Sequence, residues 1–198
     1  MANVFLLSPA RVDGRRAQIL LNPNATFDLA VRVRSVDGVP IGEAFSFLSG
    51  LYFRGKLAYA SRFGAASTFV ITTDRGLMTP DARVRLEDLR AFGAVDIASA
   101  DERYTDPLRR DAERILRELA PDACVVLLGS IATGKYADVL TSVFGERVLF
   151  PTDFVGRGDM SRGGLLLRCV DEARELAYQP VLGAVRRGSR PPKLERRR

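Results

Sequence analysis

The chain has 198 residues, of which 46% are hydrophobic and 27% are charged, a composition typical of a folded domain rather than a disordered chain. It has no histidine, which excludes histidine-based catalytic triads and HExxH zinc sites, and we expect neither a metal ion nor a cofactor. No apolar run is long enough to cross a bilayer and the N-terminus lacks the pattern of a signal peptide, so we expect a cytoplasmic protein without a membrane partner.

The net charge of +6 is concentrated at the C-terminus. Residues 185–198 hold seven basic residues and one acidic residue, which leaves residues 1–184 formally neutral. We therefore expect a single domain over 1–184, followed by a basic, flexible tail over 185–198. Such a tail either contacts the phosphate backbone of a nucleic acid or serves only as a solubilising terminus, and its charge alone does not choose between the two.

Apolar, β-branched runs predict strands, and helical spacing of apolar residues predicts the helices between them. Strands are expected at Val4–Leu7, Ser67–Thr72, Cys124–Leu128 and Arg147–Phe150, with a short edge strand at Gln179–Gly183. Helices are expected at Thr26–Val33, Leu51–Arg62, Arg83–Phe92, Asp106–Pro121, Lys135–Val143 and Leu165–Leu176. This alternation predicts a single α/β domain with a mostly parallel central sheet and helices on both faces.

Local chemistry predicts where several helices begin and end. Asp106 as N-cap, followed by Pro107 in the first turn, predicts the start of the long helix. Gly64 and Gly145 predict the ends of two other helices.

The helix over Leu51–Arg62 carries aromatic and basic side chains together. Its apolar face is marked by Leu51, Ala58 and Phe63. Lys56 falls off that face. Tyr52 is either a platform on which a base stacks or a core residue.

The segment from Gly129 to Tyr136, GSIATGKY, follows a buried strand and precedes a helix. Its spacing matches the phosphate loop of P-loop NTPases, GxxxxGK[ST], but Tyr136 stands where a Ser or Thr would ligate Mg²⁺. We therefore expect either an anion site made of backbone N–H groups and a helix N-terminus, or a tight turn that binds nothing. The residues expected to bind the anion are Gly129, Ser130, Thr133, Gly134, Lys135 and Tyr136.

Polar turns also follow the other predicted strands. Ser8 and Arg11 follow the first strand, and Asp74 and Arg75 follow the second. Because the carboxyl ends of parallel strands meet at one edge of a sheet, we expect these side chains to border one pocket. Asp74 is a candidate catalytic carboxylate, or it only pairs with Arg75 at the surface.

The segment Phe154–Gly164, FVGRGDMSRGG, holds charged residues between four glycines. Arg157 and Arg162 either bind phosphate or carboxylate as part of a substrate loop, or belong to a loop with only a structural role. Asp159 is a candidate general base or acceptor for a ribose hydroxyl. Asp159 or Ser161 equally suits the N-cap of the last helix.

Several segments together resemble one family. These segments are the first strand into Ser8-Pro9, followed by GLYFRGKLAYA, VITTDRGLMTPD, LRRDAERIL, VVLLGSIATGKYADVL and FVGRGDMSRGGLLL. They are similar to the YaaA-like proteins and to related bacterial and phage domains found among nucleic-acid modification systems. Arg75-Gly76-Leu77 matches the YGL-like element of that family, and Gly129, Ser130 and Tyr136 match its later glycine and tyrosine. The resemblance implies an α/β fold and a link to nucleic acids or their bases. The long GRGDMSRGG loop and the basic tail depart from the family.

Two functions are open at this point. The first is a nucleic-acid or nucleotide-binding enzyme, a hydrolase or transferase that processes a base or its N-glycosidic bond with Asp74 or Asp159 as the catalytic carboxylate. The second is a non-catalytic module that senses a nucleotide or binds a nucleic acid at the same anion site. A degenerate P-loop NTPase is a weaker alternative, because Tyr136 cannot ligate Mg²⁺.

Overall fold

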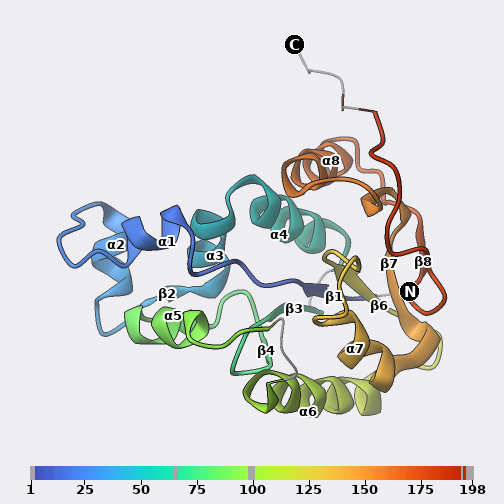
Figure 1. The fold of residues 1–198 in the computed structure, drawn as a ribbon, viewed down its shortest axis with the longest axis horizontal. Coiled ribbons are helices and arrows are strands. Elements are labelled where there is room, and N and C mark those ends of the chain that lie inside the picture. The colour runs from blue at the N-terminus through green and yellow to red at the C-terminus, as the bar shows by residue number, and fades with distance from the viewer. Residues whose placement is uncertain (1–2, 65–66, 98–100, 193, 195–198) are drawn as a thin grey trace.

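The computed structural model describes residues 3–64, 67–97, 101–192 and 194, which form an α/β fold around a six-stranded sheet (Figure 1). Its parallel strands, in spatial order, are β3 (Thr68–Ile71), β1 (Val4–Leu7), β6 (Val125–Leu128) and β7 (Val148–Pro151). Antiparallel strands form the two edges, β4 (Leu77–Met78) beside β3 and β8 (Tyr178–Pro180) beside β7. The predicted, mostly parallel sheet is confirmed.

Helices cover both faces of this sheet (Figure 1). One face carries α3 (Ile41–Ser49), α4 (Leu51–Phe63) and α8 (Asp159–Asp171), and the other carries α6 (Glu102–Glu118) and α7 (Ala137–Phe144). In β1, Phe5 and Leu7 belong to the first core, whereas Val4 and Leu6 belong to the second. Because successive strand residues point to opposite faces, β1 is buried on both sides at the centre of the fold.

Shorter elements complete the chain. The helices α1 (Arg15–Leu20), α2 (Asp28–Val33) and α5 (Leu86–Gly93) gather at one end of the molecule with a two-stranded sheet of β2 (Val39–Pro40) and β5 (Arg83–Val84) (Figure 1). Two 3-10 turns, η1 (Gly145–Arg147) and η2 (Thr152–Phe154), flank β7.

The connections that follow β1 and β6 run to opposite faces of the sheet. After β1 the chain enters α1 to α4 and then reaches β3, whereas after β6 it enters α7 on the opposite face and then reaches β7. Numbered along the chain, the parallel strands therefore lie in the order second, first, third, fourth, which is a doubly wound arrangement. The segments that leave β1 and β6 separate there, and this is the switch point at which such sheets bind ligands.

The start of α6 differs from the prediction. The helix begins at Glu102 and is capped by Asp101, whose carboxylate accepts a hydrogen bond from the backbone N–H of Arg103 at 2.9 Å. Pro107 therefore lies inside the helix, and the expected N-cap at Asp106 is wrong. The reason is local, because Asp101 supplies the capping oxygen more than one turn earlier.

The bounds of the last helix, α8, also differ from the predicted range Leu165–Leu176. It begins at Asp159 after a glycine N-cap, and no side chain caps it, so the capping role considered for Asp159 or Ser161 is wrong. It ends at Asp171, because Ala173 adopts the left-handed conformation with a φ of 49°.

The buried side of α4 was predicted wrongly. Tyr52, Lys56 and Tyr59 all lie on the buried side, with Lys56 0% exposed, whereas Leu51 and Ala58 are only half-buried. Residues spaced by three and four share one face of a helix, so the two tyrosines mark the stripe on which this lysine lies.

α4 and α8 approach each other so closely that backbone contacts backbone. A Cβ atom on Gly55 would lie 2.7 Å from the carbonyl oxygen of Gly163. A Cβ atom on Gly163 would lie 2.8 Å from the Cα atom of Tyr52. Glycine is therefore required at both positions. This contact brings Lys56, next to Gly55, within electrostatic range of Arg162, next to Gly163.

Two neighbouring glycines of α8 test this contact. We expect Gly163→Ala to lower the free energy of unfolding by about 2 kcal/mol, because the added methyl group meets backbone atoms that cannot move aside. Gly164→Ala is the matched control, since its Cβ atom would meet only Leu194 Cδ1 at 3.5 Å. It should raise stability by about 0.5–1 kcal/mol through helix propensity. Urea denaturation measures both, and equal effects would contradict the close contact.

Candidate functional site

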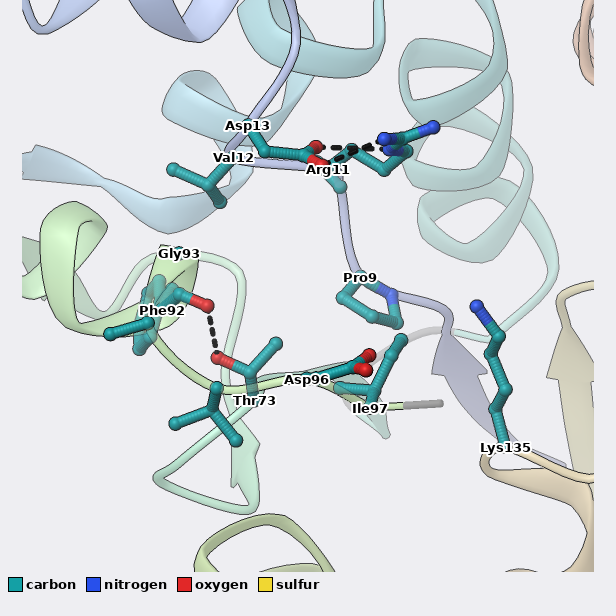
Figure 2. A pocket seen from close by; sticks show the side chains of 13 residues that line it. Pro9, Arg11, Val12, Asp13, Thr73, Phe92, Gly93, Asp96, Ile97 and Lys135 are labelled. Atoms are coloured by element: carbon teal, nitrogen blue, oxygen red, sulfur yellow. Dashed lines mark hydrogen bonds and ion pairs between the residues drawn. The ribbon is translucent and has the colours of Figure 1, made fainter. Parts of the chain in front are cut away.

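A cavity of about 570 Å³ lies at the switch point between β1 and β6, and we call it the switch cavity. Its lining includes Ser8 after β1, Ser130 and Tyr136 after β6, Tyr52 on α4 and Asp159 on α8. A second hollow of about 480 Å³ adjoins it (Figure 2). The two share Pro9, Arg11, Ile97 and Lys135.

Lys56 lies directly behind Ser8. Its Nζ atom donates hydrogen bonds to the carbonyl oxygen of Ser8 at 2.6 Å and to Ser8 Oγ at 2.9 Å. Ser8 follows Leu7, where the ladder between β1 and β6 ends, so its carbonyl oxygen is available to a side chain. The end of the central strand thus holds a buried amine against the wall of the cavity.

The surroundings of Lys56 act on its charge in opposite directions. Burial lowers the pKa of Lys56 to about 7, the carboxylate of Asp159 raises it, and the guanidinium of Arg162 lowers it. The rings of Tyr52 and Phe53 lie 4.5 and 4.7 Å from Nζ and favour the charged form. Lys56 is therefore poised to exchange a proton near neutral pH.

Tyr136 meets Ser8 from the turn after β6. Its Oη atom accepts a hydrogen bond from the backbone N–H of Ser130 at 3.0 Å. Gly129 makes room for Ser8 and Tyr136 side by side, because a Cβ atom there would lie 2.9 Å from Ser8 Cβ and 3.1 Å from Tyr136 Oη. Burial raises the pKa of Tyr136. The amine of Lys56 and the phenol of Tyr136 therefore both lie beside Ser8, at the wall of the switch cavity.

α8 contributes a pair of opposite charges. Arg162 is buried and donates from Nε and Nη2 to the carbonyl oxygen of Phe154 at 3.1 and 3.0 Å. Its Nη1 atom lies 3.5 Å from Asp159 Oδ1, and the Asp159 side chain is 70% exposed. Tyr52 Oη is buried, and burial raises the pKa of this phenol well above its usual range. Asp159 is thus the carboxylate that a ligand in the cavity can reach.

Cationic side chains surround the mouth of the cavity. Arg15 and Lys135 are exposed, and neither forms an ion pair with a residue that the structure describes. Arg11 is held by two hydrogen bonds to Asp13, and Arg16 donates to a backbone carbonyl oxygen. Lys135 extends from the turn after β6 toward the segment that follows β1 (Figure 2). The mouth therefore attracts anions.

The structure brings most of the expected site residues together. Those that line the switch cavity are Ser8, Arg11, Tyr52, Ser130, Thr133, Lys135, Tyr136 and Asp159. Gly129 supports this wall from behind, and Arg162 contacts it through Asp159.

Asp74 and Arg75 lie elsewhere. Asp74 lines a separate hollow with Arg103, and Arg75 pairs with Asp88. After β3 the chain folds back into the antiparallel strand β4, so Asp74 occupies the tip of a hairpin that turns away from the switch cavity. Thr73 instead borders the adjoining hollow, where its Oγ1 atom donates to a backbone carbonyl oxygen at 2.8 Å (Figure 2).

The Gly129–Tyr136 turn does not form an open phosphate loop. The carboxylate of Asp138 lies against Gly134 and pairs with Arg186 Nη2 at 2.7 Å. The N–H group of Ser130 is already bonded to Tyr136. A carboxylate and a phenol thus take places that a phosphate needs, which argues against an anion nest at Gly134 and against the NTPase alternative.

Arg157 belongs to a different surface. A shallow groove of about 600 Å³, here named the arginine groove, is lined by Arg157, Arg162, Arg186, Arg187 and Arg190. The chain over 185–192, predicted as part of a flexible tail, contacts the body there: Ser189 lies against Gly156, and the carbonyl oxygen of Pro192 accepts from Arg157 at 3.4 Å. Residues 193 and 195–198 of the predicted tail lie outside the described residues.

The sequence pattern did not point to Lys56. Its charge suggested a solvated position, yet it is completely buried. Two features of the sequence could have indicated that Lys56 is buried. It lies between Tyr52 and Tyr59 on one face of the helix, and lysine is rare in this chain. Only three of the 30 Lys and Arg residues are lysines.

Comparisons with protein-family models, curated proteins and solved structures found no match. The resemblance to the YaaA-like proteins therefore stays a prediction. Within the ranges that the structure describes, no helix is both long and apolar enough to span a membrane.

The buried amine predicts an unusual pH dependence of stability. Burial lowers the pKa of Lys56 to about 7, whereas an exposed lysine has a pKa of about 10.4. The unfolded chain therefore binds more protons above pH 7, and the free energy of unfolding should rise between about pH 7 and 9 by roughly 1 kcal/mol per pH unit.

Urea denaturation at several pH values measures this slope. We expect Lys56→Met to flatten it and Lys135→Met, an exposed control, to leave it unchanged. Identical slopes for wild type and Lys56→Met would contradict the burial of a neutralised amine.

Proposed function

We propose that the protein is an enzyme that binds a nucleotide or nucleic acid in the switch cavity and acts on the base or its N-glycosidic bond. The observation that carries this proposal is the buried amine of Lys56, hydrogen-bonded to Ser8 in the wall of a cavity with a cationic mouth. Switch points are the usual ligand sites of doubly wound sheets. Ionisable groups with shifted pKa values concentrate at functional sites, which favours an enzyme over a purely binding module.

Each part of the cavity suits one part of a nucleotide. Arg15 and Lys135 at the mouth suit the phosphate. The Asp159 carboxylate suits a sugar hydroxyl, or the positive charge that develops on a sugar ring when its bond to the base breaks.

Aromatic stacking of a base on Tyr52 is not supported. Lys56 Nζ lies 4.5 Å from the centre of its ring, and Phe154 packs against the ring with a centroid separation of 6.3 Å. The Tyr52 ring is therefore enclosed by protein, although the residue belongs to the lining of the cavity.

The arginine groove supports a nucleic acid as the natural ligand. Arg187 and Arg190 form no ion pair with a carboxylate of the described residues, so their charge is available to phosphates. Arg162 lines this groove and pairs with Asp159, which lines the switch cavity. A chain of nucleotides can therefore lie with one residue in the cavity and its neighbouring phosphates in the groove.

Calorimetric titration with AMP tests the cavity. We expect Arg15→Ala and Lys135→Ala each to weaken AMP binding about tenfold, the loss of one charge-assisted hydrogen bond to a phosphate. Arg83→Ala changes an exposed arginine on β5, away from the cavity, and should bind AMP as the wild type does. Wild-type protein that binds no AMP, or three variants that bind equally, would refute the proposed site.

A salt titration tests the groove. Using a fluorescent dT12 oligonucleotide and its RNA counterpart, we expect Arg187→Ala/Arg190→Ala to lower the slope of log K against log[salt] by about 1.4, since each phosphate contact in a single strand adds about 0.7. The double variant Arg114→Ala/Arg117→Ala, on the outer side of α6, is the matched control. An unchanged slope in the groove variant would exclude phosphate contacts there.

A further inference from the structure

The end of β1 pairs a serine of the switch cavity with a buried lysine. Ser8 lines the cavity, and Lys56 Nζ lies 2.9 Å from Ser8 Oγ and 2.6 Å from the carbonyl oxygen of the same residue. A neutral amine has two N–H groups and one lone pair. It can therefore donate to the carbonyl oxygen while its lone pair accepts the hydroxyl proton of Ser8. A serine hydroxyl held in this way is an activated nucleophile.

The surroundings of Lys56 favour this use of its lone pair. Lys56 is 0% exposed, and burial lowers its pKa to about 7. Asp159 and Arg162 on α8 shift that pKa in opposite directions, and Tyr52 on α4 places its ring 4.5 Å from Nζ. The phenol of Tyr136, from the turn after β6, lies beside the serine. An arginine could not act as a base here, because a guanidinium does not release its proton near neutral pH.

Tyr136 places a hydrogen-bond donor beside Ser8. Its Oη atom accepts from the backbone N–H of Ser130 at 3.0 Å, so its own proton is left for another acceptor. Ser8 and Tyr136 both line the switch cavity, and a Cβ atom on Gly129 would meet both side chains. A carbonyl group beside Ser8 can therefore accept a hydrogen bond from this phenol. Such donors stabilise the negative charge that develops on a carbonyl oxygen when a nucleophile attacks.

We propose that Ser8 is a catalytic nucleophile for acyl transfer, with Lys56 as its general base and Tyr136 as the donor to the carbonyl oxygen of the substrate. The substrate is an acyl group bound as an amide to the amino group of a base, and this carrier rests on the proposed function. Serine and lysine serve together as nucleophile and base in hydrolases of unrelated folds. The reaction is hydrolysis of the amide to a carboxylic acid and the free amino group.

The first half of the reaction transfers the acyl group to Ser8. Ser8 Oγ forms a bond to the carbonyl carbon and its proton passes to Lys56 Nζ, while an electron pair of the carbonyl group moves to the oxygen. That pair then returns, and the bond between the carbonyl carbon and the amide nitrogen breaks with its electrons on the nitrogen. The nitrogen takes the proton from Lys56, so the base leaves with a free amino group and Lys56 is again neutral.

A water molecule completes the reaction. Its oxygen forms a bond to the carbonyl carbon of the acylated Ser8, and one of its protons passes to Lys56. The bond between the carbonyl carbon and Ser8 Oγ then breaks, and Oγ takes the proton back from Lys56. The protein returns to its starting state, and one amide and one water have become one carboxylic acid and one amine.

A fluorophosphonate probe tests the nucleophile without any nucleotide, because it forms a covalent bond with an activated serine. We expect mass spectrometry of the labelled wild type to find the adduct on Ser8, and Ser8→Ala to lose it. Ser49→Ala is the matched control and should be labelled as the wild type is, because Ser49 borders the same cavity while Lys56 bonds to Ser8. An adduct on another serine, or no adduct on the wild type, would overturn the proposed nucleophile.

The pH dependence of labelling tests the base. The neutral amine is the active form, so the labelling rate of the wild type should rise through a midpoint near pH 7 and stay level above it. Lys56→Met and Lys56→Arg should each lower the rate above the midpoint by about 100-fold, the smaller end of what a general base contributes. Urea denaturation checks that both variants fold. A wild-type rate that is constant between about pH 6 and 8, or folded variants that react as the wild type does, would exclude Lys56 as the base.

AMP acetylated on its exocyclic amino group tests the carrier. We expect the wild type to release acetate, Ser8→Ala to release none, and Tyr136→Phe to be slower by about 100-fold through loss of the donor to the oxyanion. AMP acetylated on its 3′-hydroxyl group is the comparison, since its acyl group is on the sugar. Cleavage of this ester alone, or of neither compound by a protein whose Ser8 is labelled, would overturn the acylated base as the substrate. Absence of AMP binding would overturn the proposed function, and the fluorophosphonate would still decide whether Ser8 is a nucleophile.

Discussion

The contact between the backbones of α4 and α8 determines what the end of β1 can hold. Gly55 and Gly163 let the two helices meet without side chains between them, and this removes water from Lys56. Burying an ammonium group is costly, and here the two oxygens of Ser8 and two aromatic rings offset only part of that cost. The result is a lysine whose charged and neutral forms are close in free energy, placed beside a cavity that attracts anions.

The fold class could be predicted from the sequence because each strand is marked by a local run of apolar, β-branched residues. Short β-branched runs between helical segments predicted a mostly parallel sheet, which the structure confirms, whereas the order of the strands was not predicted. Helix ends were less predictable. Asp101 and Asp106 are equally good caps by residue type, and the chain uses the earlier one, which leaves Pro107 within the helix. Several residues suit such a role by type, so residue type alone does not decide which of them caps the helix.

The site was predictable where it depends on strand ends and not where it depends on helix packing. Ser8, Ser130 and Tyr136 follow β1 and β6, and the parallel sheet alone places them at one edge. Asp74 also follows a strand, but a hairpin turns it away, which no periodicity reveals. Lys56 depends on a contact between two helices far apart in the sequence, so its charge suggested the opposite of its position.

A crystal structure of the protein grown with AMP tests the central claim most directly. We expect the phosphate against Arg15 and Lys135, a sugar hydroxyl within hydrogen-bond distance of the Asp159 carboxylate, and Lys56 Nζ still bonded to Ser8. AMP bound on another surface, or a Lys56 side chain turned out to water, would contradict it.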